Sequence, residues 1–389
     1  MQQNSPSQED LGFPVPSYRF DQKNDVYKRS RWDEKIRPYA AGYYQEVKYR
    51  EKPGYGVLDY AFRNAGWTLE ATAAFGNSRS NYGLYAWEGM PSRYKQYVEN
   101  LDPVKRSPEE MSYIIKKVAH FYGADLLGVC RVHPNWIYSH EYNLMSQEHY
   151  PIEIPEGCNK AIVMAIEMDY ETIRTSPSPL GGAASGLAYS QMAFVAGLLA
   201  IFIRGIGYRA IPSGNDTAIN VPLALAAGLG EGSRSGLLIT EKLGPRLRLC
   251  KVFTDLPLLS DSYKPFGVTE FCKTCKKCAE HCPSQAISHS EMSLEGPNIS
   301  SHSGIKKWYI DGEKCFAFWS RNHAGCTNCI QVCPYNKPPG VAHDMVRAVT
   351  KRTYLFNRLF VWADTLFKYD KPANAERFWK PTPRNVHEK

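Results

Sequence analysis

The chain has 389 residues, of which 43% are hydrophobic and 13% aromatic, enough for two or three domains around a sizeable core. Its 47 basic and 39 acidic residues give a net charge of +8, but the Lys and Arg are scattered, which favours a solvated basic surface over nucleic-acid binding. The eleven cysteines are clustered, which disfavours a framework of disulfides.

The N-terminal third shows little sustained periodicity. Residues 1–105 are rich in Tyr, Pro, Arg and Gly, and we expect an irregular region that packs on the rest of the chain. The polar start has no apolar segment of the kind found in signal peptides. The longest apolar run, 192–203, ends at Arg204 and is shorter than the roughly 20 residues of a membrane-spanning helix.

Regular structure is predicted from residue 107 onward. Ser107, Pro108 and Glu110 form the signature of a helix start, and apolar residues then recur at helical spacing as far as Gly123. Apolar runs predict strands at 126–132, 161–168, 208–211, 237–240 and 247–253, a loop at 176–186, and helices at about 189–205 and 221–229. Helices that alternate with short strands indicate an α/β or α+β sandwich.

Eight cysteines lie between residues 272 and 333. They form two runs, each ending before a proline: Cys272, Cys275, Cys278 and Cys282, then Cys315, Cys326, Cys329 and Cys333. This spacing is that of two-cluster ferredoxins, in which the fourth cysteine of each run binds the other 4Fe–4S cluster. We therefore expect Cys333 to join the first three cysteines, and Cys282 to join the other three of the second run. Zinc is the competing interpretation, but a zinc site needs only four ligands from two pairs.

The remaining cysteines, Cys130, Cys158 and Cys250, are predicted to be core or bystander residues. An insertion at 316–325 separates Cys315 from Cys326. Its Trp319 is either a pocket wall or a cover for the second cluster.

Common cofactor motifs are weak or missing. In Gly228-Leu-Gly-Glu-Gly-Ser, Ser233 occupies the third glycine position of the dinucleotide-binding pattern. No GxxxxGK[ST], HExxH or GxSxG motif is present.

The order of several segments is nevertheless informative. They are Ala-Tyr-Ser-Gln with Tyr189, Pro-Ser-Gly-Asn-Asp with Asn215, Ala-Ala-Gly-Leu-Gly-Glu-Gly-Ser-Arg-Ser-Gly, Gly-Pro-Arg-Leu-Arg with Arg248, and the double cysteine run. Over about residues 107–345 this set resembles the catalytic subunits of respiratory, corrinoid-dependent reductive dehalogenases. The resemblance implies an α+β fold with a nitroreductase-like cobamide-binding core at 106–265 and a C-terminal ferredoxin-like domain with two 4Fe–4S clusters at 266–345. Residues 1–105 would line the pocket, and a tail at 346–389 would pack on the core.

The resemblance also implies a reaction. A small chlorinated hydrocarbon would be reduced, R–Cl + 2e⁻ + H⁺ → R–H + Cl⁻, by a Co(I) cobamide that the clusters supply with electrons. The cobamide is expected without its lower ligand and without a protein ligand to cobalt, and the DxHxxG motif of His-ligated cobamide enzymes is missing. The compact length is similar to that of chloroalkane (chloroform-type) reductases.

The resemblance assigns Tyr189 as the proton donor, assisted by Arg248 and Asn215. A phenol with an ordinary pKa of about 10 is a poor acid in water, but a neighbouring guanidinium stabilises the phenolate. Each residue alone is more often structural, and Asn215 stands in a natural turn sequence; their shared context favours function. Five further residues are assigned to cofactor binding: Ser185, Trp319, Gly228, Gly230 and Ser233.

Two alternatives differ in class. An epoxyqueuosine reductase acting on tRNA would carry a helical-repeat C-terminal extension and a more basic face for RNA. A non-catalytic ferredoxin-type subunit would carry electrons to a partner and bind no cobamide.

Partners and location rest on the resemblance. It implies a low-potential electron donor, a small hydrophobic membrane-anchor subunit, no nucleic acid, and room for a homodimer. It also implies a peripheral position on the extracytoplasmic face of the cytoplasmic membrane after removal of a twin-arginine leader, or a cytoplasmic enzyme if the chain is never exported.

Overall fold

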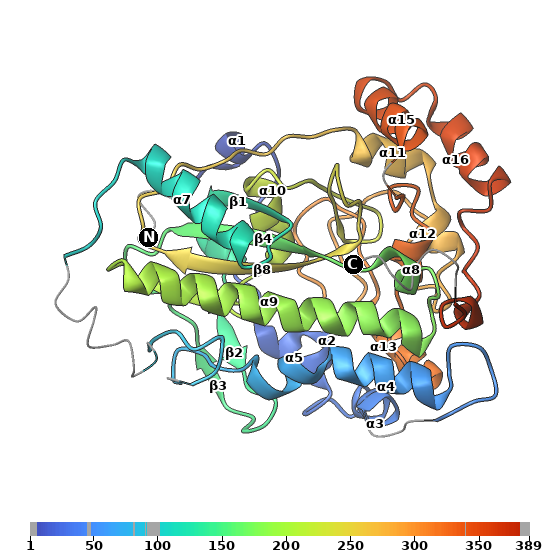
Figure 1. The fold of residues 1–389 in the computed structure, drawn as a ribbon, viewed down its shortest axis with the longest axis horizontal. Coiled ribbons are helices and arrows are strands. Elements are labelled where there is room, and N and C mark those ends of the chain that lie inside the picture. The colour runs from blue at the N-terminus through green and yellow to red at the C-terminus, as the bar shows by residue number, and fades with distance from the viewer. Residues whose placement is uncertain are drawn as a thin grey trace.

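A four-stranded antiparallel sheet organises the fold. The computed structural model describes residues 6–44, 48–80, 82–89, 91, 102–338 and 340–381. The strands lie in the order β1-β4-β8-β5, with helices around them (Figure 1). Their bounds are β1 (Leu126–Arg131), β4 (Lys160–Glu167), β5 (Ala210–Ser213) and β8 (Leu247–Thr254). This mixture of helices and an antiparallel sheet confirms the expected α+β class.

Both faces of the sheet are buried. On one face, β4 contributes Ile162, Met164 and Ile166 to a core shared with helices α7 (Pro108–Phe121) and α9 (Pro179–Gly205). The alternate residues, Ala161 and Val163, belong to a second core with α10 (Asn220–Ala226). Successive side chains of a strand point to opposite faces, so a strand covered on both sides needs a continuous apolar run.

Helix α7 begins as the sequence predicts. The Ser107 hydroxyl accepts a hydrogen bond from the backbone N–H of Glu110 at 3.2 Å, and the Glu110 carboxylate accepts one from the backbone N–H of Ser107 at 3.3 Å. Gly123 follows the helix with φ +109°. Phe121 is 85% exposed, because the buried face of the helix is formed by Met111, Ile115 and Ala119.

Helix α9 is longer than predicted, and the loop expected at 176–186 is wrong. The helix begins at Pro179, with the Ser178 hydroxyl accepting a hydrogen bond from the backbone N–H of Gly181. This is the same Ser-Pro start as in α7, masked by the glycines that follow. A Cβ on Gly186 would lie 2.3 Å from the Trp67 ring, so glycine is needed here for close packing and not for a turn.

The length of α9 also changes the membrane prediction. Among the described residues it is the one helix long and apolar enough to cross a membrane by length and composition, whereas the sequence predicted no such segment. Of its most apolar stretch, 61% is buried inside the protein. That burial is typical of a core helix.

The N-terminal region contains several helices, so the prediction of an irregular region is wrong there. Helices α4 (Val57–Gly66) and α5 (Thr68–Ala73) lie along α9, and α3 (Arg37–Tyr44) packs on α13 (Gly312–Asn322) (Figure 1). The other elements are α1 (Gln8–Leu11), η2 (Gln22–Asn24) and α2 (Val26–Arg29). They are short and use tyrosines for packing, which leaves little helical periodicity. Parts of the predicted regions 1–105 and 346–389 lie outside the described residues. They are 1–5, 45–47, 81, 90, 92–101 and 382–389.

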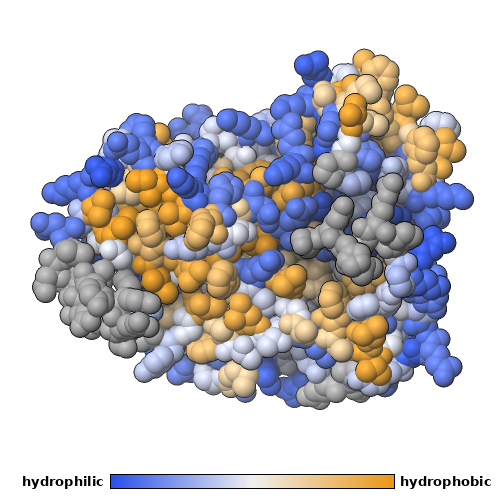
Figure 2. Space-filling view, viewed as in Figure 1, coloured by the Kyte–Doolittle hydropathy of each residue, from blue (hydrophilic) through white to orange (hydrophobic). Residues whose placement is uncertain are grey.

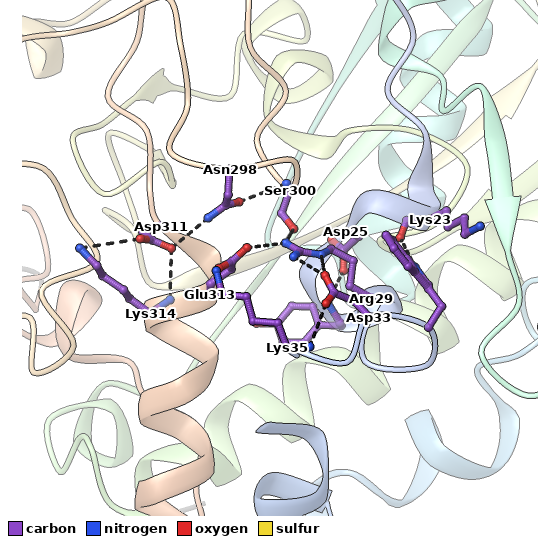
Figure 3. Close-up of polar contacts among 12 residues, drawn as sticks. Lys23, Asp25, Arg29, Asp33, Lys35, Asn298, Ser300, Asp311, Glu313 and Lys314 are labelled. Carbon is purple, nitrogen blue, oxygen red and sulfur yellow. Dashed lines mark hydrogen bonds and ion pairs between the residues drawn. The ribbon is translucent and has the colours of Figure 1, made fainter. Parts of the chain in front are cut away.

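A buried ion-pair network ties this region to the cysteine-rich segment (Figure 3). Arg29 donates to the Glu313 carboxylate at 2.7 Å and to Asp33 at 2.9 Å, and Lys35 pairs with the other Glu313 oxygen at 2.5 Å. The Arg29 side chain is only 4% exposed. Removing one partner of a buried pair strands the other charge, at a cost of about 3–5 kcal/mol.

The cysteine-rich segment and the tail are mainly helical. Besides α13, the segment contains α11 (Val268–Thr274), α12 (Lys277–Glu280) and α14 (Asn328–Gln331), and the tail contains α15 (Val341–Arg352), α16 (Asn357–Leu366) and η4 (Ala375–Arg377). Short elements complete the core: η3 (Pro134–Trp136), β2 (His140–Tyr142), β3 (His149–Pro151), α8 (Tyr170–Ile173), β6 (Glu231–Gly232) and β7 (Leu238–Ile239). Phe360 and Val361 of α16 pack against the cysteine-rich segment, while Leu359, Trp362 and Leu366 are exposed. An apolar patch is visible over α15 and α16 at the upper right of Figure 2.

Candidate functional site

Four cysteines form a first buried group, which we call cluster 1: Cys272, Cys275, Cys278 and Cys333. All four line one small cavity. Burial raises the pKa of Cys272 to about 11 and that of Cys275 to about 12. Burial also raises the pKa of Cys333, and the neighbouring Cys272 raises it further. Four such thiols become thiolates readily only when a metal neutralises their charge, so the donor set fits an iron–sulfur cluster.

The other four form a second group, cluster 2: Cys282, Cys315, Cys326 and Cys329. Burial raises the pKa of Cys326 to about 12, and Cys329 and Cys282 raise it further. The pKa of Cys329 is raised to about 11, again by burial and then by Cys282. The structure brings all eight cysteines into one region, and Cys329 also lines the cavity of cluster 1. The crossed division of the cysteines between the two clusters stays a prediction from the ferredoxin spacing.

The three remaining cysteines lie in the core, as the sequence predicts. Burial raises the pKa of Cys158 to about 11 and that of Cys250 to about 12. Cys130 is 1% exposed. Their thiols therefore stay protonated near neutral pH.

Tyr189, Asn215 and Arg248 come together from three separate elements. Tyr189 lies on α9, Asn215 follows β5, and Arg248 lies on β8. The Asn215 side-chain N–H donates to the Tyr189 hydroxyl oxygen at 2.8 Å. The Arg248 guanidinium lies over the Tyr189 ring, 5.1 Å from its centroid. Arg248 therefore contacts the ring face, and Asn215 is the residue that holds the hydroxyl.

The hydroxyl proton of Tyr189 is left available. Its oxygen accepts from Asn215, and within the described part of the chain no acceptor takes its own O–H. Asn220 fixes the orientation of the Asn215 amide, because its N–H donates to the Asn215 side-chain oxygen at 2.9 Å. Sequence reasoning missed Asn220, although it begins the predicted helix at 221–229.

Lys251 supports the loop that carries Asn215. Its ammonium group is fully buried and donates to the carbonyl oxygens of Gly214 at 2.6 Å, Asp216 at 2.8 Å and Ala218 at 2.9 Å. Burial lowers the pKa of Lys251 to about 8. Sequence reasoning missed this residue too, although a lysine inside the apolar run 247–253 was a visible signal.

Ser185 and Trp67 complete the immediate surroundings. Arg248 donates to the Ser185 hydroxyl at 3.1 Å, so this predicted cofactor-binding residue adjoins the Tyr189 group. The Trp67 ring stacks on Tyr189 with centroids 5.1 Å apart. Three buried polar atoms here have no hydrogen-bond partner among the described residues: Nε of Arg248, Nε1 of Trp67 and Oδ1 of Asn220. Unpartnered polar atoms in a buried wall fit a site whose ligand completes them, as a polar corrinoid rim would.

Trp319 lies in an aromatic group on α13, the helix that carries Cys315. Its ring is 5.6 Å from Tyr27 and 5.5 Å from Tyr43, and its indole N–H is buried without a partner among the described residues. Whether Trp319 is a pocket wall or a cover for cluster 2 stays open.

The other predicted cofactor residues have different surroundings. A Cβ on Gly228 would lie 2.5 Å from the Ser262 carbonyl oxygen, and one on Gly230 would lie 2.1 Å from that of Ile239. Both glycines are thus explained by close backbone packing. Ser233 lines the cluster 1 cavity. A contact of these three residues with a corrinoid stays a prediction.

Cys329 of cluster 2 and Tyr189 pack against the same core of α9 and the sheet. The Arg248 charge lowers the pKa of Cys329, against the larger effect of burial.

Comparison with known proteins identifies relatives of the cysteine-rich segment and of the whole chain. Residues 271–336, which include all eight cysteines, match the 4Fe-4S double cluster binding domain. The tetrachloroethene reductive dehalogenase of Sulfurospirillum multivorans is 34% identical over 397 residues, covering 94% of this chain and 78% of that protein. One from Desulfitobacterium hafniense is 38% identical over 335 residues, covering 76% of this chain but only 60% of that protein. A solved catabolic reductive dehalogenase shares the fold, with a TM-score of 0.73 at 24% identity over 95% of this chain and 50% of that one.

Proposed function

Because this chain belongs to the reductive dehalogenase family, we propose that it replaces a chlorine atom of a small chlorinated hydrocarbon by hydrogen. Family membership and the double-cluster domain also carry the expected cofactors, a corrinoid and two 4Fe–4S clusters. The observation that supports the proposal most is the Tyr189 hydroxyl, which accepts from Asn215, has no acceptor for its own proton among the described residues, and belongs to the ring under Arg248.

The balanced reaction is R–Cl + 2e⁻ + H⁺ → R–H + Cl⁻. A bound corrinoid would supply the cobalt that transfers electrons to the carbon–chlorine bond. Tyr189 would supply the proton, since its hydroxyl proton is unengaged among the described residues. Arg248 then stabilises the phenolate left behind through its charge over the ring. Asn215 keeps the hydroxyl pointing one way and stabilises the phenolate as a hydrogen-bond donor.

Electrons would reach this group through the clusters. We propose that an external low-potential donor reduces cluster 1 and that cluster 2 passes electrons onward, because Cys329 of cluster 2 packs against the same core as Tyr189. Arg248 would also favour reduction of cluster 2, since a nearby positive charge stabilises added negative charge.

The surroundings of Tyr189 favour a small apolar substrate. Trp67 stacks on its ring. Aromatic walls with a few fixed polar groups suit a polarisable halocarbon. A chloroalkane is our narrower proposal, and the chlorinated ethenes that name the relatives are its competitors.

One assay separates the candidates. Anaerobic protein with both cofactors loaded is mixed with reduced methyl viologen and with chloroalkanes, chloroethenes or halophenols, and chloride release is measured. We expect turnover of the small chlorinated substrates and none of the halophenols. Purified protein that binds no corrinoid would favour a ferredoxin-type subunit, and reduction of epoxyqueuosine in tRNA without chloride release would favour the tRNA-modifying alternative.

We further propose a peripheral position on the extracytoplasmic face of the cytoplasmic membrane, with a small hydrophobic anchor subunit as partner. Helix α16 supports this proposal. Its Phe360 and Val361 pack on the buried residues around Cys272 and Cys275, which leaves Leu359, Trp362 and Leu366 exposed on the other face for an apolar partner. Co-purification of an anchor with the wild-type chain but not with a Trp362→Glu variant would support the contact. Equal recovery with both would count against it.

A further inference from the structure

The segment 230–236 was noted in the sequence, and the proposed mechanism gives it no role. In the structure it forms the hairpin of β6 and β7, with Arg234 at its tip. The Ser233 N–H donates to the Leu237 carbonyl at 3.1 Å, and its hydroxyl donates to the same oxygen at 2.8 Å. A Cβ on Gly230 would collide with the opposite strand, so the hairpin is tightly closed. Its tip is therefore a rigid support.

The base of the hairpin caps helix α11, which carries Cys272. The N-cap residue Gly267 has no side chain to satisfy the first N–H groups of the helix. The Glu231 carboxylate does so instead. It accepts from the backbone N–H of Val268 at 3.1 Å and from the backbone N–H and hydroxyl of Thr269 at 3.4 and 3.2 Å.

The tip of the hairpin holds the other end of the same helix. The Arg234 side chain is fully buried, and its Nε and Nη2 donate to the Cys272 carbonyl oxygen at 3.1 and 3.0 Å. Its Nη1 donates to the carbonyls of Ser288 and Ser290, both at 2.9 Å. The guanidinium also lies 4.6 Å from the Trp308 ring centroid. The four hydrogen bonds and the contact with the Trp308 ring fix the positive charge of Arg234 next to cluster 1.

The partners of Arg234 are neutral, so its charge is not cancelled by direct pairing. Its guanidinium contacts the Cys272 carbonyl directly, whereas the Glu231 carboxylate binds the first turn of α11. Lys277 and Lys337 near cluster 1 pair with Asp364 at 2.6 Å each, and Asp370 adds a weaker contact to Lys277 at 3.4 Å. Lys273, next to Cys272, pairs with Glu270 at 2.5 Å. These lysines are paired with carboxylates, whereas the guanidinium of Arg234 is bound by neutral groups.

Reduction adds one negative charge to an iron–sulfur cluster, and potentials of such clusters depend on nearby charge, hydrogen bonds and burial. We propose that Arg234 is a positioning residue that raises the reduction potential of cluster 1, and that Glu231 on the same hairpin lowers it. The hairpin would thus set how readily the external donor loads the enzyme with electrons. Only the relevance to dehalogenation rests on the proposed function; the effect on cluster 1 does not.

The test is a redox titration monitored by electron paramagnetic resonance on holoenzyme with eight iron atoms per chain. We expect Arg234→Gln to lower the potential of cluster 1 and Glu231→Gln to raise it. In each case the change should be at least tenfold in the reduction equilibrium constant, which is 59 mV for one electron. The potential of cluster 2 should stay unchanged in both variants. No substrate is needed, so a failure of this inference is distinct from a failure of the proposed reaction.

Two further variants separate charge from structural damage. Arg234→Lys keeps the charge and should keep the potential near the wild-type value. Arg204→Gln is the control, because Arg204 also donates to backbone carbonyls, those of Ala86, Trp87, Gly89 and Ala210, but lies at the far end of α9. An unchanged potential in Arg234→Gln with full iron content would overturn the proposal, as would shifts of both glutamine variants in one direction. If Arg234→Gln loses cluster 1, the other two variants test the proposal. Glu231→Gln should then raise the potential of cluster 1, and Arg234→Lys should keep it near the wild-type value; any other result would overturn the proposal.

Discussion

Replacing Tyr189 by Phe removes one oxygen atom and keeps the aromatic ring. If the phenol is the proton donor, turnover should fall by about 100- to 10,000-fold, which is the usual contribution of a general acid. The loss should appear in kcat, because the ring that contacts the substrate is retained. Loading with both cofactors should stay at the wild-type level.

The structural cost of this change is small. The hydroxyl takes part in one hydrogen bond, the one from Asn215 at 2.8 Å, and Asn215 is exposed, so water can replace the lost partner. A net loss of about 0.5–1.5 kcal/mol is expected for such a bond. In a chain of this size that lowers Tm by only a few degrees, roughly 2–4 °C per kcal/mol or less. Trp67 and Arg248 keep their contacts with the ring.

The assay compares chloride release by wild type and variant with reduced methyl viologen, in H₂O and in D₂O. The wild type should be slower in D₂O if the phenol proton moves in the slow step, and the variant should lose that effect. Tyr208→Phe is the matched control, because its hydroxyl makes one hydrogen bond, to the Val104 carbonyl at 3.1 Å, away from the site. Retention of most of the turnover by Tyr189→Phe would refute the assignment.

Three other changes have definite expected outcomes. Gly186→Ala should lower the free energy of unfolding by about 1–3 kcal/mol, because the new methyl group would overpack against the Trp67 indole. Gly205→Ala is its control and should be neutral or stabilising, because no atom lies within 4 Å of the new Cβ. Thermal unfolding of both variants measures the difference. Lys251→Met removes a buried donor from three carbonyls. Gly214 keeps the bond from Asn220 and Asp216 keeps the one from Ser213, so only the Ala218 carbonyl is left without a donor among the described residues. We expect about 1–3 kcal/mol of lost stability in denaturant titrations and less support for the loop of Asn215. In the wild type, burial lowers the pKa of Lys251 to about 8, so the folded state releases this proton at a lower pH than the unfolded state does. The free energy of unfolding should therefore rise as the pH increases from about 8 toward the ordinary lysine pKa. The variant should lose that rise. Cys333→Ser should alter the paramagnetic signal of cluster 1 and leave that of cluster 2, and the reverse result would contradict the crossed ligand sets.

Local signals in the sequence predicted much of the core. The start of α7 depends on Ser107, Pro108 and Glu110, which interact within one helical turn, so no distant residue was needed to predict it. The strands β4 and β8 were legible because a sheet buried on both faces requires continuous apolar runs. The start of α9 was missed because Gly186 suggests a loop, and only the packing of Trp67 explains that glycine.

The candidate site shows the same division. Tyr189, Asn215 and Arg248 were expected together from the resemblance, but the sequence did not predict that Arg248 faces the ring while Asn215 holds the hydroxyl. Lys251 was missed because its partners are backbone carbonyls of a loop more than 30 residues away. Asn220 was missed although its partner Asn215 is only five residues away, because no local pattern shows that the two side chains meet.

The sequence by itself determined the double-cluster domain, because eight cysteines in two short runs already restrict which thiols can share a cluster. It also determined the apolar strands and the capped helix, since these depend on neighbours a few residues away. Only the tertiary structure decided what surrounds the clusters and the phenol. The placing of Arg234 against the Cys272 carbonyl joins residues 38 positions apart, and the contact of Asn215 with Tyr189 joins residues 26 apart. Such contacts depend on how the sheet, α9 and the hairpin pack, and no local pattern in the chain encodes them.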